Sequence, residues 1–178
     1  MKKYRVTLIV VLLFLATLAF VPKLKANPEG TNIIITEVLY DAPNSDTTEE
    51  WIELYNPTDT DISIDGWHIE DNYDSFSLSG VIAAGDYLVL ARDANAFYNL
   101  YGYYPDVDNL NLALSNSGDV LRLYDASNNE VDMVAWENYV DGWSISAVDT
   151  TIRRINAIDT DSVEDWENSG TLGDLGTG

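Results

Sequence analysis

The chain contains no cysteine, a single histidine and, beyond position 26, no lysine. Without cysteine it forms no disulfides, performs no thiol chemistry and builds no cysteine-ligated zinc site. A serine–histidine–aspartate mechanism would have to use His68. The lack of lysine excludes phosphate-binding loops that end in Gly-Lys-Ser/Thr, and it excludes Schiff-base catalysis. His68 shares a predicted strand face with Glu70, and we interpret it as a surface imidazole.

The few cations are concentrated at the N-terminus. Five of the nine Lys and Arg residues lie in the first 25 positions, whereas the first acidic residue is Glu29. Three of these cations precede the apolar run 6–21, which has the pattern of a secretory signal and is short for a membrane span. We therefore predict that residues 1–26 are a signal peptide and that the protein is secreted or held at the cell surface. Retention of this segment as an N-terminal anchor is the alternative.

The rest of the chain is strongly acidic. Removing residues 1–26 changes the formal charge from −21 to −26, because five cations and no acid are lost. Three interpretations remain open: a high-salt environment that screens the charge, divalent cations that bridge the acids, or a basic partner. Nucleic acids and anionic membranes are poor partners, because four arginines do not neutralise phosphate groups well enough.

Short strand patterns between turn residues cover most of the chain. Segment 50–56 alternates, with Ile52 and Leu54 on one face, and 87–91 is a continuous apolar run that indicates a central strand. The other candidate strands are 32–40, 61–65, 67–70, 75–78, 120–124, 131–136 and 151–155. This spacing predicts an all-β fold, an immunoglobulin-like antiparallel β-sandwich with one short helix.

The short helix is expected at residues 93–100. Asp93 is a suitable N-cap, and Gly102 lies just beyond the expected end. Phe97 and Tyr101 are four residues apart, so they lie on one helix face and are expected to anchor the helix to the sandwich.

Six motifs follow one another along the chain. They are ITEVLY (35–40), EWIELYNP (50–57), ISIDGWHI (62–69), IAAGDYLVLA (82–91), LSNSGDVLRL (114–123) and VDMVAW (131–136). In this order they resemble the lamin tail domain family, in particular its prokaryotic secreted branch. We therefore predict a lamin-tail-like β-sandwich domain over residues 31–170, followed by a flexible C-terminal tail over residues 171–178.

The resemblance implies an immunoglobulin-like sandwich with a binding or scaffolding role, and it transfers no catalytic residue. We therefore expect a non-catalytic binding or adhesion module whose partner is an envelope protein or a surface polymer. Animal relatives are implicated in nucleic-acid contact, but the acidic composition argues against such contact here. A secreted hydrolase that uses paired carboxylates is the weaker alternative, since no particular pair among the 30 acids stands out.

Calcium is the cofactor that the acids suggest. Segment 59–70 has the EF-hand ligand spacing, but Ile64 stands where that loop requires glycine, so we expect no EF-hand. A different set of acids crowds the loop 41–50 and the turn after the next strand: Asp41, Asp46, Glu49, Glu50, Asp59 and Asp61. Hard cations prefer oxygen ligands, so a calcium-dependent module is the alternative to a cofactor-free one. A solvated acidic surface is the competing interpretation.

Five aromatic residues lie between positions 97 and 104. Tyrosine combines apolar area with a polar tip, which suits recognition surfaces that stay partly hydrated. Tyr103 and Tyr104, just before Pro105, have no evident structural role. We therefore predict that they form a recognition surface.

Overall fold

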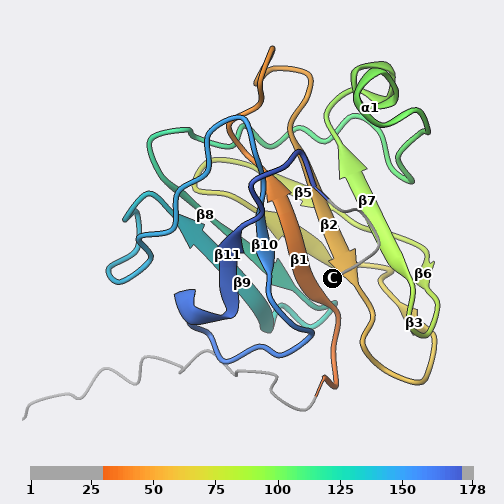
Figure 1. Cartoon of the computed structure of the whole chain (residues 1–178). Helices are drawn as coiled ribbons and strands as arrows, with labels where there is room; N and C mark the ends of the chain where they lie inside the picture. The colour runs from red at the N-terminus through yellow and green to blue at the C-terminus, as the bar shows by residue number, and fades with distance from the viewer. Residues whose placement is uncertain (1–29, 174–178) are drawn as a thin grey trace, which may run out of the picture.

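The computed structural model of the chain describes residues 30–173 (Figure 1). Its elements are β1 (Ile34–Leu39), β2 (Trp51–Tyr55), β3 (Ile62–Ser63), β4 (His68–Glu70), β5 (Ser75–Ser77), β6 (Val81–Ile82), β7 (Tyr87–Ala91), α1 (Ala94–Tyr101), β8 (Asp119–Tyr124), β9 (Glu130–Trp136), β10 (Ile152–Arg154), the 3₁₀ helix η1 (Val163–Asp165) and β11 (Trp166–Asn168). They form an all-β, immunoglobulin-like antiparallel sandwich with one short α-helix, which confirms the predicted fold class.

The larger sheet has five strands in the order β11-β10-β1-β2-β7, and each neighbouring pair is antiparallel. β1 pairs with β2, with Val38 opposite Ile52, and a bulge shifts the register between Ile35 and Glu37. All six residues of β1 are buried, so both faces of this sheet are covered at its centre. The run of β-branched and apolar residues in β1 suits such a position.

The smaller sheet has the order β5-β4-β8-β9 and is also antiparallel. β8 and β9 form a hairpin, in which the Asp125 carboxylate accepts hydrogen bonds from the backbone N–H groups of Ser127 and Asn129. Such side-chain capping is typical of Asp at the start of a turn, so the local sequence itself fixes this hairpin. β3 and β6 form a separate two-stranded ribbon.

The main hydrophobic core lies between the two sheets. Ile52 and Leu54 enter it from β2, as the alternation predicts, and Ile69, Leu123 and Trp136 enter it from the smaller sheet. All five side chains are fully buried. Each contributes roughly 1.5–3 kcal/mol relative to an exposed position, so this core supplies most of the driving force for closing the sandwich.

Helix α1 follows the end of β7 and forms the predicted helix (Figure 1). Asp93 caps its N-terminus, where the carboxylate accepts two backbone hydrogen bonds from the first turn, and Gly102 caps its C-terminus with a left-handed φ of 79°. Phe97 is fully buried in a second, smaller cluster with Leu39 and Trp51. The helix therefore covers part of the outer face of the larger sheet.

The prediction that 87–91 is a central strand is wrong, because β7 lies at the edge of the larger sheet. A loop covers this edge instead of a further strand. Ala91 N–H donates to the Val107 carbonyl at 2.9 Å, and Val107 N–H donates to the Val89 carbonyl at 3.0 Å. The loop and α1 cover the second half of this edge strand, where Val89, Leu90 and Ala91 are buried, whereas Tyr87 and Leu88 are partly exposed.

Two predictions concern the ends of the chain. The predicted signal peptide, 1–26, lies outside the described residues, and so do residues 174–178 of the predicted tail. The beginning of that tail is packed on the domain: Thr171 accepts a hydrogen bond from Thr151 N–H at 3.0 Å, and Leu172 joins the smaller cluster. Within residues 30–173, no helix has the length and apolar character needed to cross a membrane.

Candidate functional site

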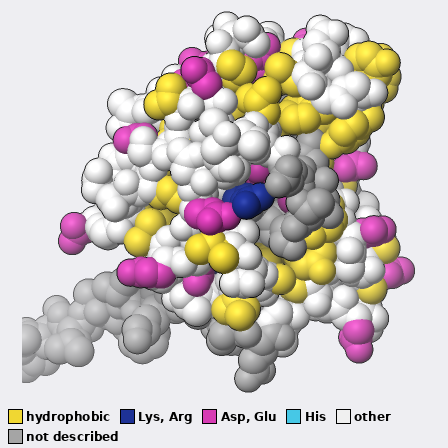
Figure 2. All heavy atoms as spheres, viewed as in Figure 1, with side chains coloured by type: hydrophobic (Ala, Val, Ile, Leu, Met, Phe, Trp, Pro, Cys, Tyr) yellow, Lys and Arg dark blue, Asp and Glu magenta, His cyan; other side chains and the backbone are white. Residues whose placement is uncertain are grey.

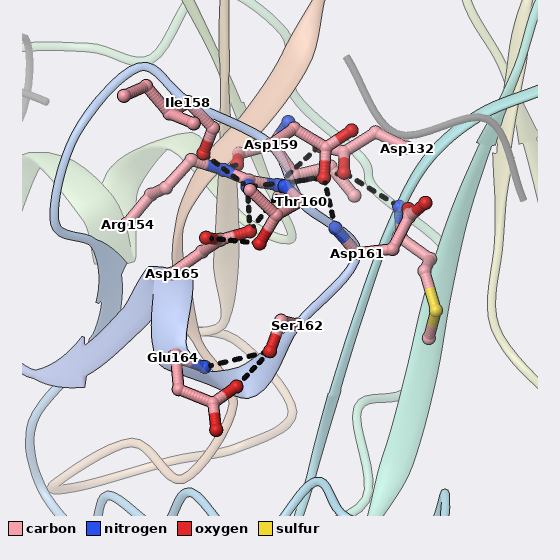
Figure 3. Close-up of polar contacts among 11 residues, drawn as sticks. Asp132, Arg154, Ile158, Asp159, Thr160, Asp161, Ser162, Glu164 and Asp165 are labelled. Carbon is pink, nitrogen blue, oxygen red and sulfur yellow. Dashed lines mark hydrogen bonds and ion pairs between the residues drawn. The ribbon is translucent and has the colours of Figure 1, made fainter. Parts of the chain in front are cut away.

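A buried ion pair joins the two sheets (Figure 3). Arg154 belongs to β10 in the larger sheet and Asp132 to β9 in the smaller one, and their side chains are 1% and 0% exposed. Arg154 Nη2 donates to both carboxylate oxygens of Asp132, at 2.8 and 2.9 Å. Ile35 N–H of β1 also donates to Asp132, at 2.6 Å, and the Ile35 carbonyl accepts from Arg154 Nε at 2.9 Å. Three strands thus share one polar junction.

The loop between β10 and β11 encloses the rest of this guanidinium group. Arg154 Nη1 donates to the Ile158 carbonyl at 3.1 Å, and carboxylate oxygens of Asp159 and Asp165 lie 3.5 Å from the same nitrogen. The Trp166 ring stacks against the guanidinium, 4.8 Å from its centroid. The group is surrounded by protein and hidden from solvent, so we assign it a structural role.

Sequence reasoning missed this junction, although a signal was present. Asp132 is a lone acid inside the apolar segment 131–136, and Arg154 lies inside another candidate strand. A charged residue in a buried strand requires an opposite charge nearby. The pattern therefore indicates that two buried strands are joined by an ion pair, but it does not identify the partner.

The acids of the predicted calcium site contact different groups. The structure brings Asp41 and Asp46 together, because the Asn116 side-chain amide donates to both, at 3.0 and 3.1 Å. Asp46 also accepts from Ala42 N–H at 2.9 Å. Burial and the nearby charge of Asp46 raise the pKa of Asp41. These two carboxylates therefore form one acidic pair at the surface.

Three further acids of the predicted site either accept hydrogen bonds from nearby backbone groups or face solvent. Glu49 accepts from the Asn44 N–H at 3.1 Å, Asp61 accepts from the Ala84 N–H at 3.0 Å, and Asp59 is exposed. Within residues 30–173, no group of three or more His, Asp or Glu side chains is arranged to hold a metal ion. Calcium binding by the six acids stays a prediction.

Glu50 differs from its neighbours because it is buried. Its side chain is 2% exposed and lies 2.8 Å from Arg92 Nη1, and it also accepts from Leu114 N–H at 3.2 Å. Burial raises the pKa of Glu50 to about 7, although Arg92 and the backbone hydrogen bond act in the opposite direction. This carboxylate, just before β2, connects the start of β2 to Arg92, just after β7, and to Leu114 in the loop before β8, which is a structural role.

Three exposed tyrosines, Tyr98, Tyr103 and Tyr104, form what we call the tyrosine surface. Their exposed fractions are 43%, 46% and 61%. The rings of Tyr98 and Tyr104 stack, with centroids 4.7 Å apart and an interplanar angle of 30°. Figure 2 shows hydrophobic side chains gathered at the upper right, where α1 lies in Figure 1. Both tyrosines predicted as a recognition surface are thus exposed, and Tyr98 adjoins them.

The tyrosine surface rests on a rigid base. The Tyr101 hydroxyl accepts from Trp51 Nε1 at 2.8 Å and donates to the Leu172 carbonyl at 2.6 Å. The Tyr103 ring meets the buried Phe97 ring edge to face, with centroids 5.6 Å apart. Phe97 and Tyr101 therefore anchor the helix as predicted. A surface fixed in this way binds without first having to be ordered, which favours affinity.

The outer face of the smaller sheet carries a polar cluster around His68. The imidazole stacks on the Tyr124 ring, with centroids 4.8 Å apart, and Glu70 lies 4.0 Å from His68 Nε2. The Tyr124 hydroxyl donates to Glu130 at 3.0 Å. His68 and Glu70 share one face, as predicted. These contacts, within β4 and across to β8, account for the half-buried imidazole without a catalytic role.

Together these features define an immunoglobulin-like module with structural buried charges and an aromatic, acidic surface. Comparison with protein-family models matches residues 26–138 to the Lamin Tail Domain. The match covers more than half of the chain, which therefore belongs to the lamin tail domain family, a family of non-enzymatic, immunoglobulin-like domains. A comparison with curated proteins finds no match. Strands β10 and β11 lie beyond the matched stretch, yet they complete the larger sheet.

Proposed function

We propose that the protein is a secreted or cell-surface binding module of the prokaryotic secreted branch of the family. In this role it holds an envelope protein or a surface polymer and catalyses no reaction. The observation that carries the proposal is the tyrosine surface, which presents three exposed rings on a rigid base. Clusters of exposed aromatic side chains often mark contact sites, because removing their apolar surface from water on binding lowers the free energy.

The proposed location rests on the sequence. The cationic start and apolar run within residues 1–26 have the pattern of an export signal. The charge of the remaining chain argues against nucleic acid and anionic membrane as partners. An envelope protein or a neutral or cationic polymer is compatible with both features.

The test replaces Tyr103 and Tyr104 with alanine and measures how much protein stays with the envelope fraction after washing. We expect the double variant to move to the soluble fraction, because most of the exposed aromatic area is lost. Tyr139→Ala is the matched control, since its ring is 53% exposed but lies after β9, and it should be retained like the unchanged protein. Envelope retention of the double variant at the unchanged level would contradict the proposed surface.

A calcium-dependent form of this function is the second candidate. Asp41 and Asp46 converge on one amide group, and oxygen-rich loops of extracellular modules bind calcium weakly. We expect millimolar calcium to raise the melting midpoint by about 3 °C relative to a chelator, since binding stabilises the folded state. The variant with Asp41→Asn and Asp46→Asn should lose this increase. An identical midpoint with calcium and with chelator would remove this candidate.

A further inference from the structure

Every cation in the described part of the chain is already paired with an acid. The four pairs are Arg92–Glu50 (2.8 Å), Arg122–Glu130 (3.6 Å), Arg153–Glu167 (2.8 Å) and Arg154–Asp132 (2.8 Å). Residues 30–173 contain no lysine, so the surface that they form presents many acids and no unpaired arginine. A binding surface on this domain therefore lies in a negative field, which attracts cations and repels anions.

Acids also border the tyrosine surface itself. Asp106 and Asp108 are exposed and follow Tyr104 closely in the chain. Each carboxylate is fixed by a backbone N–H group that donates to it, at 2.8 Å in both cases. Burial raises the pKa of Tyr103, and the negative charges of Glu53 and Asp106 contribute to the same shift, so Asp106 lies near the Tyr103 ring. The aromatic groups and fixed negative charges therefore occupy one corner of the molecule.

The two stacked rings have faces available for a ligand. Tyr98 and Tyr104 contact each other through one face each, and the exposed fractions of 43% and 61% show that much of both side chains remains open to solvent. The face of an aromatic ring carries negative partial charge and attracts ammonium and guanidinium groups. Nearby carboxylates add to this attraction, because they too favour a positively charged group.

We propose that the occupant of the tyrosine surface is a lysine- or arginine-rich segment of a partner polypeptide, an inference that rests on the proposed binding function. Cationic side chains of this segment lie on the outer faces of Tyr98 and Tyr104. Neighbouring cations pair with Asp106 and Asp108. The aromatic faces give the contact its position, and the surrounding acids increase the rate of encounter.

A neutral sugar chain fits the same surface less well. Flat sugar rings stack best on aromatic rings that lie side by side, whereas Tyr98 and Tyr104 stack on one another. A neutral sugar also gains nothing from the negative field, and an anionic wall polymer is repelled by it. The paired arginines and bordering acids therefore favour a cationic polypeptide over a glycan.

The experiment titrates the purified protein with a fluorescent oligolysine peptide and follows binding by anisotropy. The same peptide with acetylated lysines serves as an uncharged probe, and chitohexaose serves as a neutral sugar probe. The variants are a Tyr98→Ala, Tyr104→Ala pair and a Tyr98→Phe, Tyr104→Phe pair, with Tyr139→Ala as the matched exposed-ring control. A melting curve for each variant shows that it is folded.

We expect the alanine pair to weaken oligolysine binding about 5- to 30-fold, the loss of two exposed cation–π contacts. The phenylalanine pair should bind within about 3-fold of the unchanged protein, because its rings keep their negative faces. Tyr139→Ala should bind like the unchanged protein, and the acetylated peptide should not bind. If the alanine pair fails to fold, the phenylalanine pair still tests the proposal. Loss of oligolysine affinity in the phenylalanine pair, which keeps both aromatic rings, would overturn it.

Two other results would also overturn it. Equal oligolysine binding by the unchanged protein and the folded alanine pair would show that overall acidity alone holds the peptide. Chitohexaose binding that depends on Tyr98 and Tyr104, without oligolysine binding, would identify a glycan surface. In either case, loss of envelope retention on tyrosine replacement would still support the proposed function, so failure of the two proposals can be distinguished.

Discussion

Asp132 is the residue on which the connection between the sheets depends most directly. Its carboxylate has no exposed surface and accepts hydrogen bonds from Arg154 and from the Ile35 N–H. A buried charge loses its hydration, and a partner with good geometry has to compensate for that loss. Arg154 provides this compensation through Nη2, which donates to both carboxylate oxygens, so the two residues are expected to act as a unit.

We predict that Arg154→Met lowers the free energy of unfolding by about 3–5 kcal/mol, because it leaves the Asp132 carboxylate buried without its partner. Urea denaturation measures this change. Arg122→Met is the matched control, since its pair with Glu130 is longer at 3.6 Å and its side chain is 32% exposed, so we expect a loss below about 1 kcal/mol. Adding Asp132→Asn to Arg154→Met should restore part of the stability. Equal losses in the two single variants would show that the buried pair does not hold the sheets together.

At the scale of elements, those whose determinants are local could be predicted from the sequence. The bounds of α1 follow from a capping aspartate and a terminal glycine. The β8–β9 hairpin follows from the turn residues 126–130, which lie between the apolar runs 120–124 and 131–136. In both cases the signal and the structure that it specifies lie within a few residues. Such elements need no knowledge of the rest of the fold.

Elements that depend on distant partners were predicted less well. β7 has the composition of a central strand because a loop covers its edge, which periodicity does not reveal. β11 (Trp166–Asn168) was not predicted, since three residues that include an acid and an amide show no alternation. It is a strand because β10 lies beside it and pairs with all three residues. Neighbours far along the chain therefore decide what these segments become.

The candidate surfaces follow the same division. The exposure of Tyr103 and Tyr104 agrees with their predicted place after a helix whose apolar face was already assigned. The stacking of Tyr98 on Tyr104 and the pairing of all four arginines depend on the folded arrangement. Composition reveals that cations are few, but the three-dimensional structure is needed to show that none of the four arginines is left unpaired.

At the scale of the whole molecule, folding buries or partly buries several carboxyl groups, and this makes the stability of the protein depend on pH. Burial raises the pKa of Glu50 to about 7 and that of Asp161 to about 6, and it raises the pKa values of Asp119 and Glu130 as well. One oxygen of the Asp161 carboxylate is buried without a hydrogen-bond partner. These groups bind protons more tightly in the folded protein than in the unfolded chain, where carboxyl pKa values are about 4.

Stability should therefore decrease as the pH rises through the window between these two sets of pKa values, from about pH 4.5 to about pH 7. In this window the folded state holds more protons than the unfolded state, so unfolding releases protons. Because a higher pH favours the release of protons, it favours unfolding and lowers the free energy of unfolding. We predict a melting midpoint that is highest near about pH 5 and several degrees lower at about pH 8. Glu50→Gln should flatten this dependence, because the amide does not titrate. Molar NaCl should raise the midpoint more at the higher pH, where more exposed acids repel one another. A midpoint that rises between these two pH values would contradict the assignment of the buried carboxyls.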